Sequence, residues 1–555
     1  MPTIEFSLKD LNKLVGKNIS LDELGEKYIL FAKGEIEEID GEMIKADMKD
    51  TNRPDLWSVE GLARELKGHC DIEVGIPKFE IKKSNLVVKV DKKVKSVRPK
   101  TVCAVVKNLN LDENSIKQMI QLQEKVCQTF GKNRDMAAIG VYDYDKIKGP
   151  IKYTTFKPKE LKFKPLGFDK EMSLEEILKI HPKGLEYRHL LKGKKEYPIF
   201  IDNNKNVLSM PPIINSDYTG RVDEKTKNVF IEVSGHDIDR ISIALNVIVT
   251  ALRERGGEIF SVDVVYGKEK ITTPNLSPKK FKMNINKCKK ILGLDLDKKE
   301  IVDLLKKSRF DAKIVGNDIY VSYIPYRNDI MDERDLIEEV AISYGYDKIE
   351  PEKIEINSKG EELPIEIFSN KIREICIGFG IQEILTFTLT SKENLTSKMR
   401  KNDKIIELSN PVSLSWSVFR NSLIPNGLEF LSNNKHVQYP QKIFEIGDVL
   451  EIDEKKETKT NDVRKLSILL TDSEIGYEKI SSILKSFMNA IGVEYDLKEI
   501  EDRSFIIGRC ASVIVEDETV GIIGEIHPEV LENFDLEKPV IGMELNLSRL
   551  MKLSS

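Results

Sequence analysis

The sequence predicts a multidomain α+β protein, and three observations lead to this fold class. The chain has 555 residues, enough for about three or four domains that each bury a core. Hydrophobic residues make up 40% and charged residues 32%, as is typical of a soluble globular protein. Helix and strand patterns also occur in separate blocks, with hairpin-rich strands that favour antiparallel sheets over a doubly wound one. We expect four domains, at residues 1–80, 85–268, 272–352 and 356–555.

The first block, residues 1–80, predicts a small α/β domain. Residues 2–8 have the pattern of a strand, and residues 9–15 and 20–28 that of short helices. Ser58 is a good N-cap, because an amphipathic set of residues follows it directly. A further helix should therefore begin after Ser58.

The second block, residues 85–268, predicts an α/β domain with two amphipathic helices. Apolar stripes over 116–130 and 241–252 are each followed by glycine, a common helix terminator. Residues 229–235 alternate apolar and polar side chains, which predicts a half-buried strand. Its polar side would present a glutamate and a serine together, either to solvent or to a binding site, at Glu232 and Ser234.

The third block, residues 272–352, predicts a compact helical unit with a β-wing. Asp297 begins a capping-box pattern, and a hairpin with a Gly-Asn turn should follow over 312–323. This order is typical of a winged helix-turn-helix. The last block, residues 356–555, alternates helices with strong strands, among them 384–389 and 441–447. We expect an antiparallel sheet there, with helices packed on one side.

Acidic residues cluster directly after the predicted wing. Asp335, Glu338 and Glu339 are spaced i, i+3 and i+4, so a helix would place their carboxylates on one face. Asp329 precedes them in a segment where Pro325 disfavours helix. A loop carboxylate that faces a helical trio can bind a hard cation such as Mg²⁺, which prefers oxygen ligands. The alternative is a solvated acidic face whose charge is balanced by two arginines, Arg327 and Arg334.

Composition excludes several classes of function. The net charge of −5 argues against a bulk polyanion binder, although the local basic runs 92–100 and 157–164 could meet phosphates. Six scattered cysteines without a C-x-x-C pair disfavour a disulfide framework or zinc site and indicate a reducing cytoplasm. No apolar run has the length of a membrane span, and no phosphate loop, nucleophile elbow or zinc-protease motif is present.

Four segments, in order along the chain, resemble one known family. They are Asn52 to Arg64 (NRPDLWSVEGLAR), Leu208 to Ser216 (LSMPPIINS), Tyr326 to Tyr346 with its YRNDI and DLIEEVAISYGY motifs, and Ile523 to Leu531 (IGEIHPEVL). On these residues the chain resembles the beta subunits of phenylalanyl-tRNA synthetase in their shorter archaeal and eukaryotic-like form. Because the segments span nearly the whole chain, the resemblance is specific.

The resemblance implies a role for the second domain. In the family this domain edits, hydrolysing tyrosine mis-attached to tRNA(Phe). Editing answers a physical need, because an apolar pocket rejects an added hydroxyl only weakly. A carboxylate or hydroxyl that bonds the tyrosine phenol would supply the selectivity. The candidates are Ser209, Glu232 and Ser234, and the alternative is a purely structural pair on the strand.

The resemblance also implies roles for the last two domains. The acidic cluster matches a family site for Mg²⁺ shared with the alpha subunit, at Asp329, Asp335, Glu338 and Glu339. The final domain resembles a class II synthetase core without catalytic motifs, so ATP-dependent activation would take place on the alpha subunit. Arg420 resembles an ATP-binding arginine, but without a glycine-rich partner motif we expect it to be structural.

The function implied is that of a cytoplasmic subunit in an (αβ)₂ heterotetramer. The complex would attach phenylalanine to tRNA(Phe) with ATP, and this chain would contribute scaffold, editing pocket and shared Mg²⁺ site. Two alternatives stay open. One is a non-catalytic assembly and tRNA-binding scaffold with a decayed editing site, and the other is a free-standing editing hydrolase.

Overall fold

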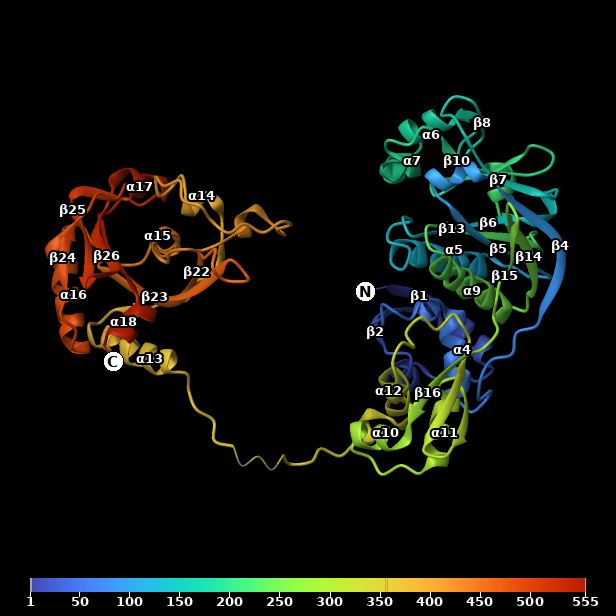
Figure 1. The fold of residues 1–555 in the computed structure, drawn as a ribbon, viewed down its shortest axis with the longest axis horizontal. Helices are drawn as coiled ribbons and strands as arrows, with labels where there is room; N and C mark the ends of the chain where they lie inside the picture. The colour runs from blue at the N-terminus through green and yellow to red at the C-terminus, as the bar shows by residue number, and fades with distance from the viewer. Residues whose placement is uncertain (1, 355, 357, 555) are drawn as a thin grey trace. The chain divides into compact units, whose positions relative to one another are not determined.

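Two units make up the chain in the computed structural model, which describes residues 2–354, 356 and 358–554 (Figure 1). The first unit spans residues 1–353 and the second residues 354–555. The first unit contains the ranges predicted for three domains, and the second contains the fourth. In the described ranges, no helix combines the length and apolarity that a membrane span requires.

The N-terminal part of the first unit is a small antiparallel sheet with helices packed on it. Its strands, in the order β1-β3-β2, are β1 (Thr3–Ser7), β3 (Met43–Met48) and β2 (Gly34–Asp40). Helix α1 (Leu8–Val15) packs against α4 (Val59–His69), and α4 begins where the Ser58 hydroxyl accepts a hydrogen bond from the Gly61 amide. The predicted helix 20–28 is a composite that passes through a π-helical turn, with α2 (Leu21–Glu23), the turn (Leu24–Tyr28) and α3 (Ile29–Phe31).

A large mixed sheet forms the centre of the first unit, in the order β12-β11-β10-β7-β4-β14-β5-β13-β6, with β15 on β14. The strands are β4 (Ile81–Val90), β5 (Lys100–Lys107), β6 (Ala137–Asp143), β7 (Ile151–Phe156), β10 (Tyr197–Ile201), β11 (Val207–Met210), β12 (Ile214–Asn215), β13 (Val229–Gly235), β14 (Glu258–Tyr266) and β15 (Glu269–Thr273). Helices α5 (Glu113–Gln128) and α9 (Ile238–Glu254) pack on one face, and their core is continuous with that of the N-terminal sheet.

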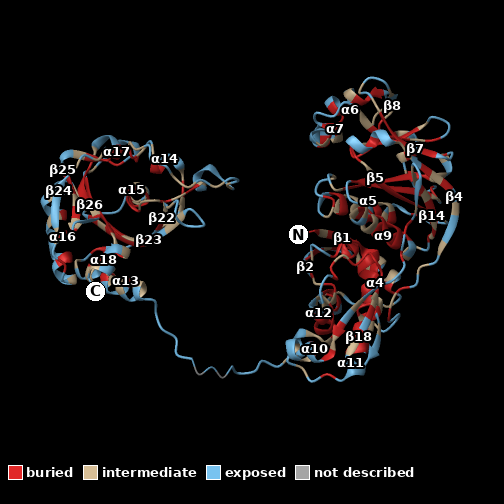
Figure 2. Ribbon diagram, in the orientation of Figure 1, coloured by how far each residue is buried: buried red, intermediate tan, exposed pale blue. Residues whose placement is uncertain are grey.

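The expectation of a half-buried strand at 229–235 was wrong. Every residue of β13 is buried, because β13 lies between β5 and β6 and both of its faces are covered. Residues such as Ile231 and Val233 pack towards α5 and α9, while Phe230 packs with Tyr142 and Phe200 on the other face. Figure 2 shows the central strands as buried. The polar residues of this strand therefore do not face bulk solvent.

A helical lobe covers the β10 and β11 end of the sheet. It contains α6 (Leu174–Ile180) and α7 (Pro182–Tyr187) and packs against Met210 and Ile213. The basic run 157–164 lies at its edge. Phe163 belongs to the lobe's core and is therefore not available to stack on a base, whereas Lys157 and Lys162 are exposed.

The third predicted domain has the expected helices and hairpin. Its sheet order is β16-β18-β17, with β16 (Lys279–Asn284), β17 (Asp311–Val315) and β18 (Asp318–Tyr323). Helices α10 (Ile285–Leu292), α11 (Lys298–Lys307) and α12 (Glu333–Tyr344) share its core. The predicted capping box is confirmed, since Asp297 accepts from the Glu300 amide and Glu300 from the Asp297 amide.

The second unit is built on a mostly antiparallel sheet in the order β19-β22-β23-β27-β26-β25-β24. The strands are β19 (Gln382–Glu383), β22 (Gln441–Ile452), β23 (Thr460–Thr471), β24 (Asp496–Glu499), β25 (Phe505–Val515), β26 (Glu518–Ile526) and β27 (Val540–Asn546). One core beneath the sheet includes α13 (Pro364–Gly378), α16 (Tyr477–Ile491) and α18 (Leu547–Leu553). A second core includes α15 (Ile424–Asn433) and α17 (Pro528–Asn533).

Two expectations for this unit were wrong. Helices pack against the sheet in two separate cores, and not on one side only. The strand expected over 384–389 is largely irregular, and only β20 (Leu389–Thr390) forms at its end. Leu385 and Phe387 are 86% and 71% exposed, so the apolar pattern there does not correspond to burial within this chain.

Candidate functional site

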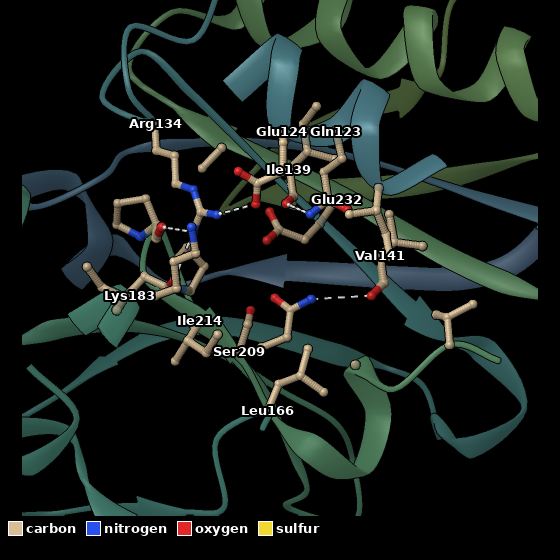
Figure 3. Close-up of a pocket in the computed structure, with 18 of the residues that line it drawn as sticks. Gln123, Glu124, Arg134, Ile139, Val141, Leu166, Lys183, Ser209, Ile214 and Glu232 are labelled. Carbon is tan, nitrogen blue, oxygen red and sulfur yellow. Dashed lines mark hydrogen bonds and ion pairs between the residues drawn. The ribbon is translucent and has the colours of Figure 1, made fainter. Parts of the chain in front are cut away.

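A cavity of about 310 Å³ opens in the second predicted domain beside strand β6 (Figure 3). Its walls are mostly apolar and come from α5, from β6, from β12 with the loop before it, and from the segment between β8 (Lys162–Phe163) and β9 (Met172–Ser173). They include Ile116, Met119, Ile139, Val141, Leu166, Ile213 and Ile214. This volume lies at the lower end of the usual range for small-molecule sites, and the lining suits an aromatic side chain.

Two of the three predicted editing residues, Ser209 and Glu232, line this cavity. The third, Ser234, is fully buried, and its hydroxyl accepts a hydrogen bond from Arg98 Nε at 3.0 Å. The structure therefore brings Ser209 and Glu232 to one wall and places Ser234 behind Glu232 on the same face of β13. Ser234 can influence Glu232 without contacting a molecule in the cavity.

The Glu232 carboxyl reaches the cavity because strand β6 has a glycine opposite it. Glu232 is paired in register with Gly140, and a methyl group on Gly140 would lie 2.8 Å from Glu232 Oε1. The neighbouring Tyr142 hydroxyl lies 3.1 Å from Oε1 and 2.8 Å from Ser209 Oγ. The second oxygen, Oε2, has no partner at hydrogen-bond distance and angle among the residues that the structure describes.

Burial raises the pKa of Glu232 from its ordinary value of 4.5 to about 8. The Tyr142 hydroxyl, the charge of Arg98 and the Ser234 hydroxyl act in the opposite direction, but burial outweighs them. A buried carboxyl without a cationic hydrogen-bond partner favours its neutral form, because ionisation in a dry site is unfavourable. Near neutral pH this side chain can therefore donate a hydrogen bond as well as accept one.

A buried arginine supports the site from behind. Arg98 is 3% exposed and donates to three backbone carbonyls, those of Arg134, Asp135 and Ser234. It joins the loop after α5 to strand β13. The suggestion that the basic run 92–100 meets phosphates is therefore wrong for Arg98, because its guanidinium makes internal hydrogen bonds.

Arg134 closes one end of the cavity. Its guanidinium donates to the Ile213 carbonyl at 2.9 Å and pairs with Glu124 at 3.1 Å, and it lies over the ring of Tyr187. Figure 3 shows Arg134 joined to Glu124 on one side and to the opposite wall on the other. One side chain thus ties α5, the β11–β12 loop and the helical lobe together.

The acidic cluster forms part of a buried ion-pair network. Arg327 bonds Asp329 at 2.9 Å and Glu339 at 2.7 Å, and Arg53 from the N-terminal domain also lies 3.4 Å from Glu339. Arg53 in turn bonds Asp55 at 2.9 Å, and Glu65 at 3.2 Å. Burial raises the pKa of Asp329, but Arg327 and Arg53 outweigh it and hold this pKa at about 2.

The other two predicted metal ligands point elsewhere. Asp335 accepts hydrogen bonds from the Met331 and Asp332 amides and so caps its own helix. Glu338 is half-exposed and pairs with Lys33 at 3.1 Å. Over the described residues, no three acidic, histidine or cysteine side chains are placed to hold a metal. In this single chain each of the four carboxylates has another partner.

Charge balance at this cluster differs from the solvated face considered as the alternative. Arg327 does compensate Asp329 and Glu339, but it does so in a buried network. Arg334 is exposed and pairs with Asp332, outside the cluster.

In the second unit, Arg420 is 3% exposed and has internal partners. It bonds Glu445 at 2.7 Å and the Thr386 hydroxyl at 2.8 Å, and donates to the Asp448 carbonyl. This agrees with the structural role expected for it.

Sequence reasoning missed four residues of the cavity region: Arg98, Arg134, Gly140 and Tyr142. A signal existed for Gly140 alone, since a glycine inside a strand indicates a close approach of neighbouring groups. The other three have ordinary side chains in ordinary contexts, and their roles arise from contacts between distant segments.

Comparisons with known proteins agree with this arrangement. Residues 349–547 match the family model for the phenylalanyl tRNA synthetase beta chain CLM domain, residues 281–346 that for the tRNA synthetase B5 domain, and residues 84–255 that for the B3/4 domain. These matches define the class, a subunit of an aminoacyl-tRNA synthetase.

Full-length relatives give the family. The chain is 49% identical over 552 residues to the phenylalanine–tRNA ligase beta subunit of Pyrococcus abyssi, covering 99% of both chains. It is 47% identical to that of Pyrococcus horikoshii over the whole of both chains. A crystal structure of an N-terminal fragment of the Pyrococcus horikoshii phenylalanyl-tRNA synthetase beta subunit matches 62% of this chain and 100% of that fragment, with a TM-score of 0.61 and 50% identity. The chain belongs to the family of phenylalanine–tRNA ligase beta subunits.

Proposed function

We propose that this chain acts with an alpha subunit to attach phenylalanine to tRNA(Phe) with ATP, and that its own cavity hydrolyses mischarged Tyr-tRNA(Phe). The single observation that carries the editing assignment is the Glu232 carboxyl, which is 2% exposed, belongs to a residue that lines the cavity, and has one oxygen without a hydrogen-bond partner among the described residues. A tyrosine phenol would complete the hydrogen bonding of that oxygen. Phenylalanine has no group that could do so, and a site with an unsatisfied polar group rejects the ligand that leaves it unpaired.

The test uses the complex of the two subunits and measures deacylation of Tyr-tRNA(Phe) and Phe-tRNA(Phe). Loss of one hydrogen bond in a buried site should slow Tyr-tRNA(Phe) hydrolysis by Glu232→Ala roughly tenfold to a hundredfold. Hydrolysis of Phe-tRNA(Phe) should change little. Glu224→Gln, at an exposed glutamate of the same domain, is the matched control.

Three outcomes separate this proposal from its alternatives. If the wild-type complex does not hydrolyse Tyr-tRNA(Phe), the chain is a scaffold with a decayed editing site. If the isolated chain hydrolyses it as fast as the complex does, the chain is a free-standing hydrolase. If Glu232→Ala leaves the rate unchanged, editing takes place but the assigned residue is wrong.

The architecture of the last two domains belongs to the same proposal. We infer a winged-helix-like fold for the β16–β18 domain and a class II synthetase-like core in the second unit, in which Arg420 stabilises the fold. The internal pairing of Arg420 with Glu445 supports a structural role for Arg420, because an arginine that is already paired does not offer its charge to ATP. Amino-acid activation is accordingly assigned to the alpha subunit, in an (αβ)₂ assembly.

Binding of Mg²⁺ at Asp329, Asp335, Glu338 and Glu339 stays a prediction. The position of all four on or beside α12 supports it, while the arginine pairing of Asp329 and Glu339 opposes it. Sizing of the complex with and without chelator tests it, together with Asp335→Ala. Weaker association with the alpha subunit in both experiments would support a bridging ion. Unchanged assembly would leave the cluster with an internal ion-pair role only.

A further inference from the structure

We propose that Tyr142 is a positioning residue that fixes the Glu232 carboxyl so that only Oε2 faces the cavity. This inference rests on the proposed editing function. It adds the residue that orients the Glu232 carboxyl for the recognition of tyrosine. Tyr142 is fully buried, and its hydroxyl lies within hydrogen-bond distance of both Ser209 Oγ and Glu232 Oε1. Among the described residues, the Tyr142 hydroxyl is the recorded hydrogen-bond partner of Oε1, so it is the group placed to orient this oxygen.

The three hydroxyl and carboxyl groups form a short hydrogen-bonded chain with a direction. A phenol has one proton and can donate to only one of its two neighbours at a time. When Glu232 is ionised, Tyr142 donates to Oε1 and accepts from Ser209. When Glu232 is neutral, the carboxyl can donate to Tyr142, which then donates to Ser209. In both states Oε1 stays engaged and Oε2 stays free.

Packing holds the Tyr142 ring where this chain of bonds requires it. The ring contacts Phe230 at a centroid distance of 5.8 Å, inside the core formed by β5, β13 and β14. Gly140 leaves the space that the hydroxyl fills, since a methyl group there would lie 2.1 Å from the Tyr142 oxygen. Gly140 and Tyr142 on β6 therefore act together, because a side chain at residue 140 would displace the Tyr142 hydroxyl.

Two variants test the proposed role of the Tyr142 hydroxyl. Tyr142→Phe keeps the ring and removes the hydroxyl, whereas Gly140→Ala keeps the hydroxyl but crowds both it and Glu232 Oε1. Both should lower the ratio of Tyr-tRNA(Phe) to Phe-tRNA(Phe) deacylation by about tenfold, the effect of losing one neutral hydrogen bond. Because the Tyr142 hydroxyl lowers the pKa of Glu232, both should also move the pH profile of Tyr-tRNA(Phe) deacylation to higher pH.

Tyr153→Phe is the matched control. Tyr153 is also fully buried, and its hydroxyl donates to the Arg98 carbonyl at 2.9 Å, with no hydrogen bond to Glu232 or Ser209 recorded for the described residues. This control should lose a comparable hydrogen bond but leave both the ratio and the pH profile of the wild-type complex unchanged. A merely structural role for Tyr142 would make Tyr142→Phe behave like Tyr153→Phe.

The outcomes separate the inference from the function on which it rests. A wild-type complex that does not hydrolyse Tyr-tRNA(Phe) overturns the proposed function and the inference with it. A wild-type complex that hydrolyses it, with Tyr142→Phe equal to Tyr153→Phe in ratio and pH profile, overturns the inference alone. A lower ratio and a shifted profile in Tyr142→Phe, absent from Tyr153→Phe, confirm it, and Gly140→Ala should then show at least as large a change.

Discussion

Replacing Glu232 by glutamine should change how the stability of the first unit depends on pH. Glutamine keeps the shape of the side chain and cannot ionise. In the wild-type chain, burial raises the pKa of Glu232 to about 8 in the folded state, compared with an ordinary value of 4.5. The folded state therefore binds this proton more tightly than the unfolded state does, and the stability that it provides is complete below pH 4.5 and is lost as pH rises towards 8.

The magnitude follows from these two values. Between them the free energy of unfolding should fall by about 1.4 kcal/mol per pH unit through this group. From about pH 5 to about pH 7.5 the loss amounts to roughly 3 kcal/mol. Glu232→Gln lacks this loss, so its stability relative to wild type should rise by that amount across the same range. Other titrating groups are common to both chains and cancel in the difference.

Intrinsic fluorescence can follow the first unit alone. The chain has two tryptophans, and Trp57 is fully buried in the core that the N-terminal domain shares with α5 and α9. In a Trp416→Phe background, urea unfolding followed by fluorescence reports on Trp57. Glu224→Gln, measured in parallel, controls for the loss of one carboxylate in the same domain.

A stability difference between Glu232→Gln and wild type that is equal at both pH values would refute the reasoning. It would mean that water or a cation reaches the carboxyl in the folded state. The proposal that an unpaired, water-excluded Glu232 oxygen recognises the tyrosine hydroxyl would then have to be abandoned.

Two further predictions concern buried ion pairs. Arg327→Met should destabilise the first unit by about 3–5 kcal/mol, since it leaves Asp329 and Glu339 without their nearest cation. Urea unfolding followed by Trp57 fluorescence measures this, and a loss no greater than that of the exposed Arg334→Met would contradict it. Arg420→Met should destabilise the second unit by a similar amount, about 3–5 kcal/mol, because the buried Glu445 would lose its cation and keep only the hydrogen bonds from the Thr386 amide and hydroxyl. Urea unfolding followed by Trp416 fluorescence in a Trp57→Phe background tests it, and an unchanged midpoint would show that Glu445 finds water or another partner.

Periodicity and capping signals predicted several of the regular elements. Helices α5 and α9 and the β17–β18 hairpin have strong local patterns, and all three form close to the predicted bounds. The segment 384–389 shows where this method fails, since a strand needs a neighbour as well as an apolar pattern. In this chain a neighbouring strand pairs only with the residues at the two ends of this segment.

The candidate site was predicted in part. Glu232 and Ser209 could be found because a polar residue inside a strand pattern and a family motif both pointed to them. Arg98 could not, because a buried arginine and a surface arginine look alike in a basic run, and only the carbonyls that surround it distinguish them. Tyr142 lies in a strand of buried residues, and the role proposed for it depends on oxygen atoms of two other strands, those of Ser209 and Glu232.

The placement of Arg53 has a consequence for synthesis of the chain. Its contact with Glu339 joins residues 286 positions apart. Glu339 is therefore synthesised long after the N-terminal domain has emerged from the ribosome. Meanwhile Asp55 and Glu65, which lie only 2 and 12 residues away, can hold the guanidinium. Arg53 therefore has acidic partners within its own domain before α12 is synthesised, and the contact with Glu339 can form only afterwards.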